Sequence, residues 1–390
     1  MLRKFLKILA AIPLALVLGV AIILVLLRLE HGLSITLPSP SGQFTVGRTM
    51  EHWVDGTRAD SLAPAAGQKR ELMVWIWYPA APNPSSKLAE YQPGPVRAAS
   101  AREEGIVMNK FFTRDVSLVH THSFLDPDIS PAHPTYPVVF MKSGIGALAT
   151  DYTTLAEDLA SHGYIVVGSD SPYSTFVVVF PDGRVATRTP AGNPSEELPE
   201  LDRKKVASEL IKVWSADTSF ELDQLEHSPG KFRGRLDLQS VGVFGHSFGG
   251  ATAAQFCHDD HRCKAGIDLD GQPFGSVIQE GITQPFLFLL SDHSNESADS
   301  QREILGNIKS ICNSDAASCQ IGTLPGSHHF NFSDQSLLKD HTLGRLARAL
   351  GPIDQRRGLG IIAACVHTFF DGHLKNAPPA PLQDLGVKMW

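Results

Sequence analysis

The sequence predicts an α/β fold in which a mostly parallel central sheet carries helices on both faces. From residue 136 onward, short apolar β-prone runs alternate with helical patterns, which is typical of repeated strand–helix units. A Gly-x-Ser-x-Gly motif stands between one such run and a helix of small residues. The 390 residues are 43% hydrophobic and 19% charged, as expected for a globular protein with one large core.

The N-terminal segment predicts a membrane anchor over residues 1–30. Ile8–Leu27 is an unbroken apolar run, long enough to cross ~30 Å of hydrocarbon as a helix. Arg3, Lys4 and Lys7 precede it, so the N-terminus is expected in the cytoplasm and the remainder on the periplasmic or extracellular side. A cleavable signal peptide is the competing interpretation, but its apolar region is usually about 7–15 residues and ends in an Ala-x-Ala-like site. We therefore expect an uncleaved signal-anchor, and a secreted protein if the leader is cleaved.

The segments before residue 136 are expected to form the edge of the fold. Residues 31–70 predict a linker with an edge strand near Gln43–Val54, and residues 71–390 are expected to form one main domain. Glu71–Pro79 is alternating and aromatic-rich, which predicts a strand ended by its proline. One helix is expected around Ala98–Phe112.

The remaining elements follow the β/α alternation. Strands are expected at Tyr136–Met141, Tyr164–Gly168, Leu236–Phe244, Ala265–Asp270, Pro285–Leu290 and Ser318–Leu324. A hairpin over Phe176–Ala186 turns at Asp182-Gly183. Helices are expected at Asp151–His162 with Asp151 as N-cap, at 195–226, and at Thr342–Leu350 and Gly358–His373.

The net charge and the cysteines bear on the expected partners, disulfides and metal sites. A formal net charge of -7 provides no basic surface, so no nucleic-acid partner is expected. Cys257 with Cys263 and Cys312 with Cys319 can each close a short loop, and Cys365 is expected as a buried thiol. Two histidines and two aspartates between Cys257 and Cys263 raise a metal site as an alternative. A disulfide or a reduced helix end is favoured, since no ligand pattern repeats.

Gly245-His246-Ser247-Phe248-Gly249 carries the strongest functional signal. It follows the β-prone run Ser240–Phe244 and precedes the small residues Gly250–Phe256. A strand, a sharp turn and a helix in this order form the nucleophile elbow of the α/β-hydrolase fold, which exposes a serine hydroxyl above the sheet. Ser247 is therefore predicted to be a catalytic nucleophile.

A serine nucleophile needs a histidine base, which in this fold lies late in the chain. His328 and His329 directly follow the last strand expected in the parallel series. Spacing alone does not decide which of these two neighbouring histidines is the base. His246, within the elbow, is interpreted as a turn residue rather than a base.

The carboxylate that orients the base also has two candidates. Asp270 ends the strand after the elbow helix, and Asp292 follows the next strand. Asp268 is less favoured, because it lies mid-strand one pleat before Asp270.

An oxyanion hole requires two backbone N–H groups directed at the developing charge. One is expected from Phe248, the residue after the nucleophile. The other is expected from the glycine-containing loop Lys142–Gly146, which follows the Tyr136–Met141 strand.

These residues together resemble the plasma-type (lipoprotein-associated) platelet-activating factor acetylhydrolase family and its bacterial and fungal relatives. The similarity spans roughly residues 70–335 and includes the elbow, the Asp270 spacing and a Gly326-x-x-His329-x-x-Phe332-x-Asp334 pattern. The resemblance implies Asp270 as the acid and His329 as the base. It also implies the Ile145 N–H as the second oxyanion donor.

The chain departs from that family in its oxyanion loop. Members often have His-Gly or Pro-Gly before the apolar residue, whereas this chain has Ser143-Gly144 preceded by Lys142. The departure bears on substrate preference.

The resemblance implies hydrolysis of short or oxidised sn-2 acyl esters of phospholipids through an acyl-enzyme, without cofactor or metal. This is the reaction of a 1-alkyl-2-acetylglycerophosphocholine esterase. The expected partners are an ester or phospholipid substrate and the membrane that holds the N-terminal helix. A broad-specificity carboxylesterase or polyester hydrolase is the alternative. From another class, an inactive binding module would be expected to lack a triad residue, and none is missing.

Overall fold

A computed structural model describes residues 2–103, 114–195, 197–293, 298–312, 319–339, 344–345, 348–378 and 380–390, without the side chains of 2–12, 14 and 298–300. The main sheet contains β1 (Ile35–Thr36), β2 (Val46–Ala59), β3 (Lys69–Ala81), β4 (Leu88–Glu90), β5 (Val119–Leu125), β6 (Asp128–Ile129), β7 (Tyr136–Lys142), β8 (Ile165–Asp170), β11 (Leu236–His246), β12 (Cys263–Leu269), β13 (Phe286–Leu290), β14 (Cys319–Thr323) and β15 (Lys388–Met389). A separate hairpin pairs β9 (Val177–Val179) with β10 (Val185–Thr187), as predicted.

The α-helices are α1 (Leu2–His31), α2 (Gly94–Glu103), α4 (Thr153–Ser161), α5 (Glu200–His227), α6 (Phe248–Asp259), α7 (Val277–Glu280), α8 (Ala298–Ile311), α9 (Gln335–Leu338) and α11 (Gln355–Leu374). Short 3-10 turns are η1 (Val116–Leu118), η2 (Ala149–Tyr152), η3 (Gly230–Phe232), η5 (His329–Phe332) and η6 (Leu382–Leu385). Strands and helices alternate along the chain after β7, so the predicted α/β fold is confirmed.

The order of the strands sets the position of the site. The path runs β1-β5-β2-β3-β8-β7-β11-β12-β13-β14-β15, and the strands from β8 to β14 are parallel. After β7 the chain first adds β8 on one side and then returns to add β11 on the other. Loops at such a reversal diverge and leave a crevice at the carboxyl ends of the strands, where α/β proteins bind their ligands.

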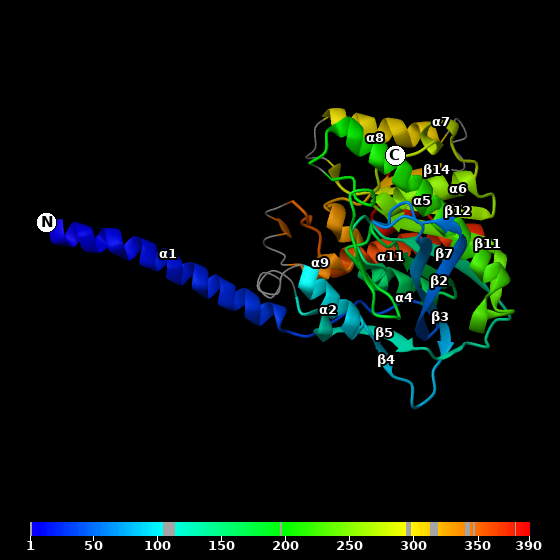
Figure 1. Cartoon of the computed structure of the whole chain (residues 1–390), viewed down its shortest axis with the longest axis horizontal. Helices are drawn as coiled ribbons and strands as arrows, with labels where there is room; N and C mark the ends of the chain where they lie inside the picture. Colours follow the sequence, from blue (N-terminus) through cyan, green and yellow to red (C-terminus); the bar gives the residue numbers. More distant parts are fainter. Residues whose placement is uncertain are drawn as a thin grey trace.

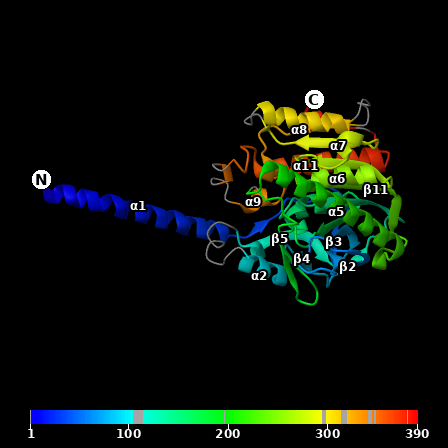
Figure 2. The ribbon, with the colours of Figure 1, turned by 45° about the horizontal axis from the view of Figure 1, so that its top comes forward.

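Alternating side chains of the parallel strands fill two cores, one on each face of the sheet. Val139 and Met141 of β7 pack with α4 and α11, whereas Val138 and Phe140 pack with α5, α6 and α8. The period of two places successive residues on opposite faces, so a strand buried on both sides is apolar throughout. In both views of the ribbon, α8 and β4 lie at opposite ends of the folded body (Figures 1 and 2).

Four predicted elements differ in detail. β3 continues through Pro79 to Ala81, because proline lacks only its N–H: the Pro79 carbonyl accepts a hydrogen bond from Ser130, and the Ala80 N–H donates to Thr45. The prediction that proline ends this strand is wrong. The helix expected at Ala98–Phe112 begins earlier, as α2, and its expected end lies outside the described residues.

The helix expected at Asp151–His162 is divided into η2 and α4. Asp151 lies inside η2, where its carboxylate accepts a hydrogen bond from the Leu148 N–H, and Tyr152 occupies the N-cap position of α4. Asp151 as N-cap is therefore wrong, because a 3-10 turn precedes the α-helix. Of the helix expected at Thr342–Leu350, the structure describes Gly344 and Arg345, which are helical, and Arg348–Leu350, which are not.

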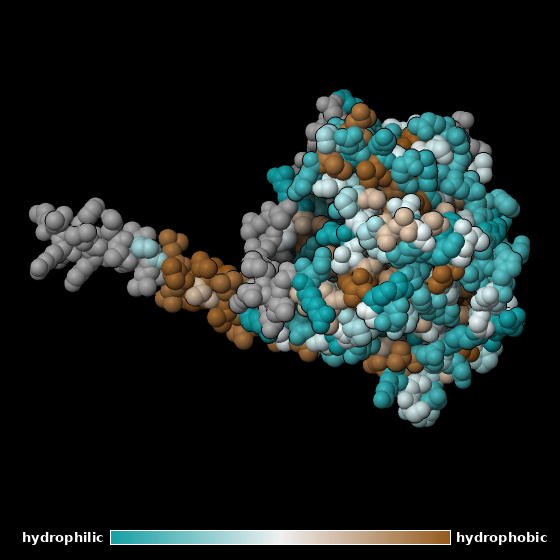
Figure 3. Space-filling model, in the orientation of Figure 1, coloured by the Kyte–Doolittle hydropathy of each residue, from teal (hydrophilic) through white to brown (hydrophobic). Residues whose placement is uncertain are grey.

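α1 projects from the folded body as one long helix (Figure 1). The part of it that is coloured in Figure 3 has a mostly apolar surface. Its exposed large apolar side chains are Leu16, Val17, Leu18, Val20, Ile22, Ile23, Val25, Leu26 and Leu29. Within the side chains that the structure describes, no helix meets the length and apolarity needed to cross a membrane. The described side chains begin at Pro13, inside the Ile8–Leu27 run.

Both cysteine pairs form disulfides. Cys257 is bonded to Cys263, and Cys312 to Cys319. The pairing confirms the short loops suggested by the spacing and removes these cysteines as metal ligands. Cys365 is a buried free thiol, and burial raises its pKa to about 12.

Candidate active site

The elbow is a tight connection between β11 and α6. Ser247 lies between them with φ 57° and ψ −125°, a backbone conformation that is strained for a residue with a side chain. A Cβ on Gly245 would lie 2.1 Å from the Gly249 carbonyl oxygen, and a Cβ on Gly249 would lie 2.1 Å from that of Lys142. The two glycines are required because no side chain fits between strand and helix. The turn thereby places Ser247 at the carboxyl end of the sheet.

Asp270 and His329 meet beside the elbow. Asp270 follows β12 and His329 begins η5, and Asp270 Oδ2 lies 2.7 Å from His329 Nδ1. A carboxylate only accepts hydrogen bonds, so Nδ1 carries the proton and donates it. The remaining ring nitrogen, Nε2, then has a free lone pair, which is the tautomer a general base requires.

The second oxygen of Asp270 is also occupied. Oδ1 lies 2.9 Å from His293 Nε2 and accepts a 2.7 Å hydrogen bond from the Ser291 N–H. Burial raises the pKa of Asp270, but the hydrogen bonds and charges of His293 and His329 outweigh it. The net result is a pKa well below the usual range of a carboxyl. Asp270 is therefore held as the anion.

The sequence analysis did not single out His293. It follows β13 at the same carboxyl edge that carries Ser247 and Asp270. This position could have been recognised from the sequence, because a histidine just after a parallel strand lies near the crevice where ligands bind.

The other acid candidates have different partners. Asp292 Oδ2 accepts a hydrogen bond from the Gly326 N–H at 3.0 Å, and the Asp292 N–H donates to the Ser327 carbonyl at 3.0 Å. These bonds attach the end of β13 to the loop that carries the histidine. Asp268 accepts from the Gly271 N–H at 2.6 Å, and burial raises its pKa well above the usual range.

Of the two neighbouring histidines, His329 contacts the acid. His328 Nδ1 lies 2.9 Å from the Arg348 carbonyl oxygen, and the His328 N–H donates to Asn331. Extended backbone at His328 followed by a 3-10 turn directs the two side chains differently. The choice between them, which spacing left open, is a matter of loop conformation.

His246 belongs to a buried hydrogen-bond chain that crosses the site. The Gly144 N–H donates to the Tyr152 hydroxyl, which lies 2.8 Å from His246 Nδ1, and His246 Nε2 lies 2.9 Å from the His329 carbonyl oxygen. A carbonyl only accepts, so Nε2 is protonated and Nδ1 accepts from Tyr152. Burial, with a contribution from His329, lowers the pKa of His246 to about 3, so the ring is neutral. His246 is thus neither a base nor merely a turn residue, because it connects the oxyanion loop to the histidine loop.

The expected oxyanion donors flank Ser247. A Cβ on Gly144 would lie 3.3 Å from Ser247 Cβ, so the loop after β7 lies against the nucleophile. The Gly146 N–H donates to Ser174, whereas the Ile145 N–H has no acceptor within the part of the chain that the structure describes. Phe248 is the first residue of α6, where helix N–H groups lack intrahelical acceptors. Two N–H donors are thus available beside the serine.

Lys142, the departure from the family pattern, is directed away from the site. Its Nζ lies 2.8 Å from Glu221 Oε1 and 2.8 Å from Ser169 Oγ, and both Lys142 and Glu221 are buried. The ammonium is satisfied inside the core and does not reach the serine.

The candidate residues share one open cavity of about 470 Å³. Its lining is Ser247, Asp270, Gly271, Gln272, Ser291, Asp292, His293, Ile304, His328, His329 and Arg348. Among the described residues, the guanidinium of Arg348 forms no ion pair, so it brings a positive charge to the lining. The cavity combines a serine hydroxyl, an imidazole nitrogen with a free lone pair and a buried carboxylate anion. Such a combination suits acyl transfer.

The family model for platelet-activating factor acetylhydrolase, isoform II, matches residues 32–172 and 204–377. The guinea pig (Cavia porcellus) platelet-activating factor acetylhydrolase is 28% identical over 262 residues, which is 61% of this chain and 58% of that protein. A probable 1-alkyl-2-acetylglycerophosphocholine esterase of Arthroderma benhamiae is 27% identical over 365 residues, covering 86% of this chain and 88% of that protein.

Among solved structures, a ferulic acid esterase from Streptomyces cinnamoneus superposes with a TM-score of 0.76. It is 28% identical, and the match covers 91% of this chain and 99% of that one. The chain spans less than two thirds of the mammalian relatives it matches. Because the family model covers most of the sequence in two long segments, this chain belongs to the platelet-activating factor acetylhydrolase, isoform II, family.

Proposed function

We propose that the protein is a serine carboxylic-ester hydrolase with Ser247, His329 and Asp270 as its triad. The observation that carries the proposal is the Asp270–His329 hydrogen bond of 2.7 Å in the cavity that Ser247 lines. The comparisons support it, because the relatives are named as acetylhydrolases and esterases.

In this proposal Ser247 Oγ attacks the ester carbonyl while His329 Nε2 takes its proton. Asp270 holds the imidazole and stabilises its cation, and the N–H groups of Ile145 and Phe248 stabilise the oxyanion. His329 returns the proton to the departing alcohol, which leaves an acyl-serine. A water molecule, deprotonated by the same nitrogen, then releases the carboxylic acid and regenerates Ser247.

The proposed substrates are short or oxidised sn-2 acyl esters of phospholipids. Two features support this class. The relatives are named for such esters, and the Arg348 guanidinium lines the same cavity as Ser247 and Asp270. A guanidinium is suited to bind a lipid phosphate. Arg348→Gln is expected to raise KM for a phosphocholine lipid and to leave KM for p-nitrophenyl acetate within about twofold.

The test compares p-nitrophenyl acetate with a 2-thioacetyl phosphocholine lipid, using the full chain in detergent. Ser247→Ala and Asp270→Asn are expected to lower kcat on both substrates by at least about a thousandfold. Asp292→Asn is the matched control, since it alters a carboxylate on the same cavity. Equal loss in Asp292→Asn would overturn the assignment of the acid.

A broad-specificity carboxylesterase is the second candidate, and the likeness to a ferulic acid esterase over nearly its whole length favours it. Cleavage of p-nitrophenyl acetate and methyl ferulate without the thioester lipid would select this function. No turnover of any ester by the wild-type chain would select an inactive binding module instead.

We also propose that residues 1–30 anchor residues 71–390 to a membrane, with residues 31–70 as linker and edge strand and the catalytic domain on the periplasmic or extracellular side. The exposed apolar side chains of α1 and the Arg3, Lys4 and Lys7 cluster before them support this arrangement. The full chain should float with liposomes after an alkaline wash, and the chain without residues 1–30 should not. Release of the full chain by the wash, or a mature N-terminus after residue 20, would contradict the anchor.

A further inference from the structure

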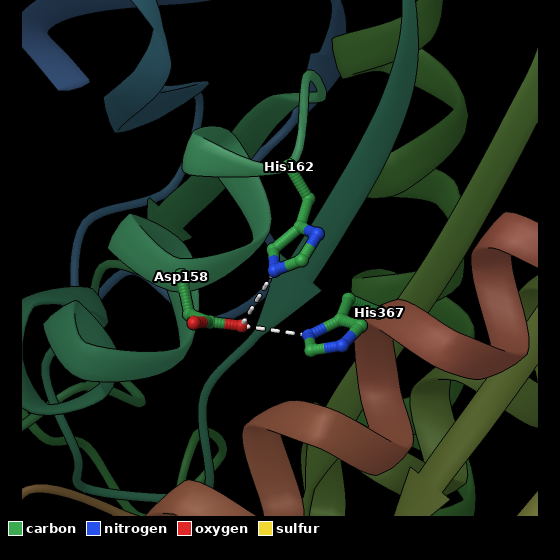
Figure 4. Close-up of side chains that lie close together, drawn as sticks. All are labelled: Asp158, His162 and His367. Atoms are coloured by element: carbon green, nitrogen blue, oxygen red, sulfur yellow. Dashed lines mark hydrogen bonds and ion pairs between the residues drawn. The ribbon is translucent and has the colours of Figure 1, made fainter. Parts of the chain in front are cut away.

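A cluster of three metal-ligating side chains lies outside the catalytic cavity. Asp158 belongs to α4, His162 caps the end of that helix, and His367 belongs to α11 (Figure 4). One oxygen and two ring nitrogens converge, and all three atoms lie within 4.8 Å of one another. Among the described residues, this is the one group of three or more such side chains that could hold a single ion.

The distances suit a small divalent cation. Asp158 Oδ2 lies 2.9 Å from His367 Nδ1 and 4.0 Å from His162 Nε2. Zinc binds histidine nitrogen and carboxylate oxygen at about 2.0–2.2 Å with tetrahedral geometry, so neighbouring ligand atoms lie about 3.3–3.5 Å apart. The two distances bracket that value, and changes of about half an ångström in each would bring both to it.

The cluster also has the outer contacts that orient metal ligands. Asp158 Oδ1 accepts hydrogen bonds from the Ser41 N–H at 2.8 Å and from its hydroxyl at 2.7 Å, which leaves Oδ2 facing both rings. The Ser41 hydroxyl also lies 2.9 Å from His162 Nε2, the ring nitrogen that faces Asp158, so this hydroxyl lies next to the three converging atoms rather than behind them. Ligating carboxylates are commonly held by hydrogen bonds of this kind.

The two imidazoles stack with 3.8 Å between their centroids and 18° between their planes. Stacking brings one nitrogen edge of each ring to the same carboxylate oxygen, as Figure 4 shows. Lys375 is the nearby cation. Its Nζ donates to the His162 carbonyl and pairs with Asp371 at 2.9 Å, so its charge is matched beside the cluster.

We propose that Asp158, His162 and His367 bind one zinc ion, with water or the Ser41 hydroxyl as the fourth ligand. The ion would attach the end of α4 to α11 and, through Ser41, to the segment that precedes β2. Asp158 is buried, His162 is half-buried and Ser41 is exposed, so binding would fasten an exposed part of the N-terminal segment to the folded body.

The location predicts a structural rather than a catalytic role. α4 leads into the amino end of β8, whereas Ser247 and Asp270 follow the carboxyl ends of β11 and β12. The cluster therefore lies at the edge of the sheet opposite the proposed triad. Zinc at this site should raise the melting temperature by mass action and leave ester hydrolysis unchanged.

The test uses the full chain without a histidine tag, stripped with EDTA and titrated with ZnCl₂ by calorimetry. One zinc per chain is expected, and His162→Ala and His367→Ala should each weaken binding by at least about tenfold. His373→Ala is the matched control, because His373 is an exposed histidine on the same helix outside the cluster. Co²⁺ bound to the wild-type chain should give the visible absorption band that is typical of a tetrahedral site. Both cluster variants should lack this band.

Three outcomes would overturn the proposal: no binding tighter than about 100 μM, equal binding by wild type and His367→Ala, or zinc inhibition of ester hydrolysis at the binding midpoint. The last would place the ion at the catalytic histidines. If His367→Ala does not fold by circular dichroism, His162→Gln keeps the test decisive, because glutamine retains polarity without the imidazole.

Discussion

At the scale of single residues, Asp270 is distinguished by the number of groups that bind its two oxygens. His329, His293 and the Ser291 N–H all donate to it. A carboxylate held in this way keeps its charge and its orientation. His293 is thus a positioning residue, since it acts on the base only through Asp270.

His293→Ala is expected to lower kcat by about tenfold, which is ~1.4 kcal/mol, with KM within about twofold. The reason is that Asp270 loses a donor and holds His329 less firmly. Steady-state kinetics on p-nitrophenyl acetate measures the effect. His328→Ala, on the same cavity, is the control, and an equal loss there would show that the effect is not specific to Asp270.

Tyr152 joins the oxyanion loop to the histidine loop through His246. Tyr152→Phe keeps the ring and removes the hydroxyl, so kcat should fall about tenfold while KM changes little. Tyr164→Phe is the matched control, because its hydroxyl bonds to Asp371 on α11. Retention of full kcat by Tyr152→Phe would show that this chain does not position the site.

At the scale of elements, the elbow depends on the close approach of β7, β11 and α6. Gly249→Ala is expected to prevent native folding or to remove activity, since the added carbon would lie 2.1 Å from the Lys142 carbonyl oxygen. Gly360→Ala, in α11, has open space around the added carbon and should raise the free energy of unfolding by about 0.5–1 kcal/mol. Urea unfolding of both variants separates the effect of sterics from that of helix propensity. A soluble, active Gly249→Ala would contradict the packing described.

At the scale of the whole molecule, several buried carboxyls have raised pKa values. Burial raises the pKa of Asp170 from 3.8 to about 6, and it raises those of Asp268 and Asp334 well above the usual range. In such groups the folded state binds protons more tightly than the unfolded state. These carboxyl groups therefore stabilise the folded state at low pH. The stabilisation is lost as the pH rises through the pKa that each group has in the folded state.

As pH rises from about 4.5 to 7, Asp170 alone should remove on the order of 2–3 kcal/mol from the free energy of unfolding. His246 acts in the opposite direction over the same range, because its pKa is lowered to about 3 in the folded state. Below about pH 4 the trend should reverse, because the lowered pKa of Asp270 stabilises the fold only while it is ionised. Urea unfolding across this range measures both limbs. The difference in stability between Asp170→Asn and wild type should grow in favour of the variant from about pH 4.5 to 7, and a difference that does not change with pH would contradict the prediction.

The sequence by itself determined the architecture and the position of the elbow that carries Ser247. Periodicity of two, apolar runs and the Gly-x-Ser-x-Gly turn are local features, so they identified the parallel strands, the elbow and Ser247 without knowledge of the fold. Short spacing indicated that both cysteine pairs could close a loop, and the structure shows that both disulfides form. The local signals failed at Pro79 and Asp151, where pairing with Thr45 and a 3-10 turn decided the element boundaries.

Only the tertiary structure decided which groups meet. Asp270, His293 and His329 come from loops after three different strands. Both Asp270 and Asp292 follow a strand, but the folded loops place the two histidines against Asp270 and the Gly326 N–H against Asp292. The same is true of Asp158, His162 and His367, which two distant helices bring together. The physical reason is that side-chain contacts between remote segments depend on loop conformation and helix packing. Neither is encoded in the spacing of residues along the chain.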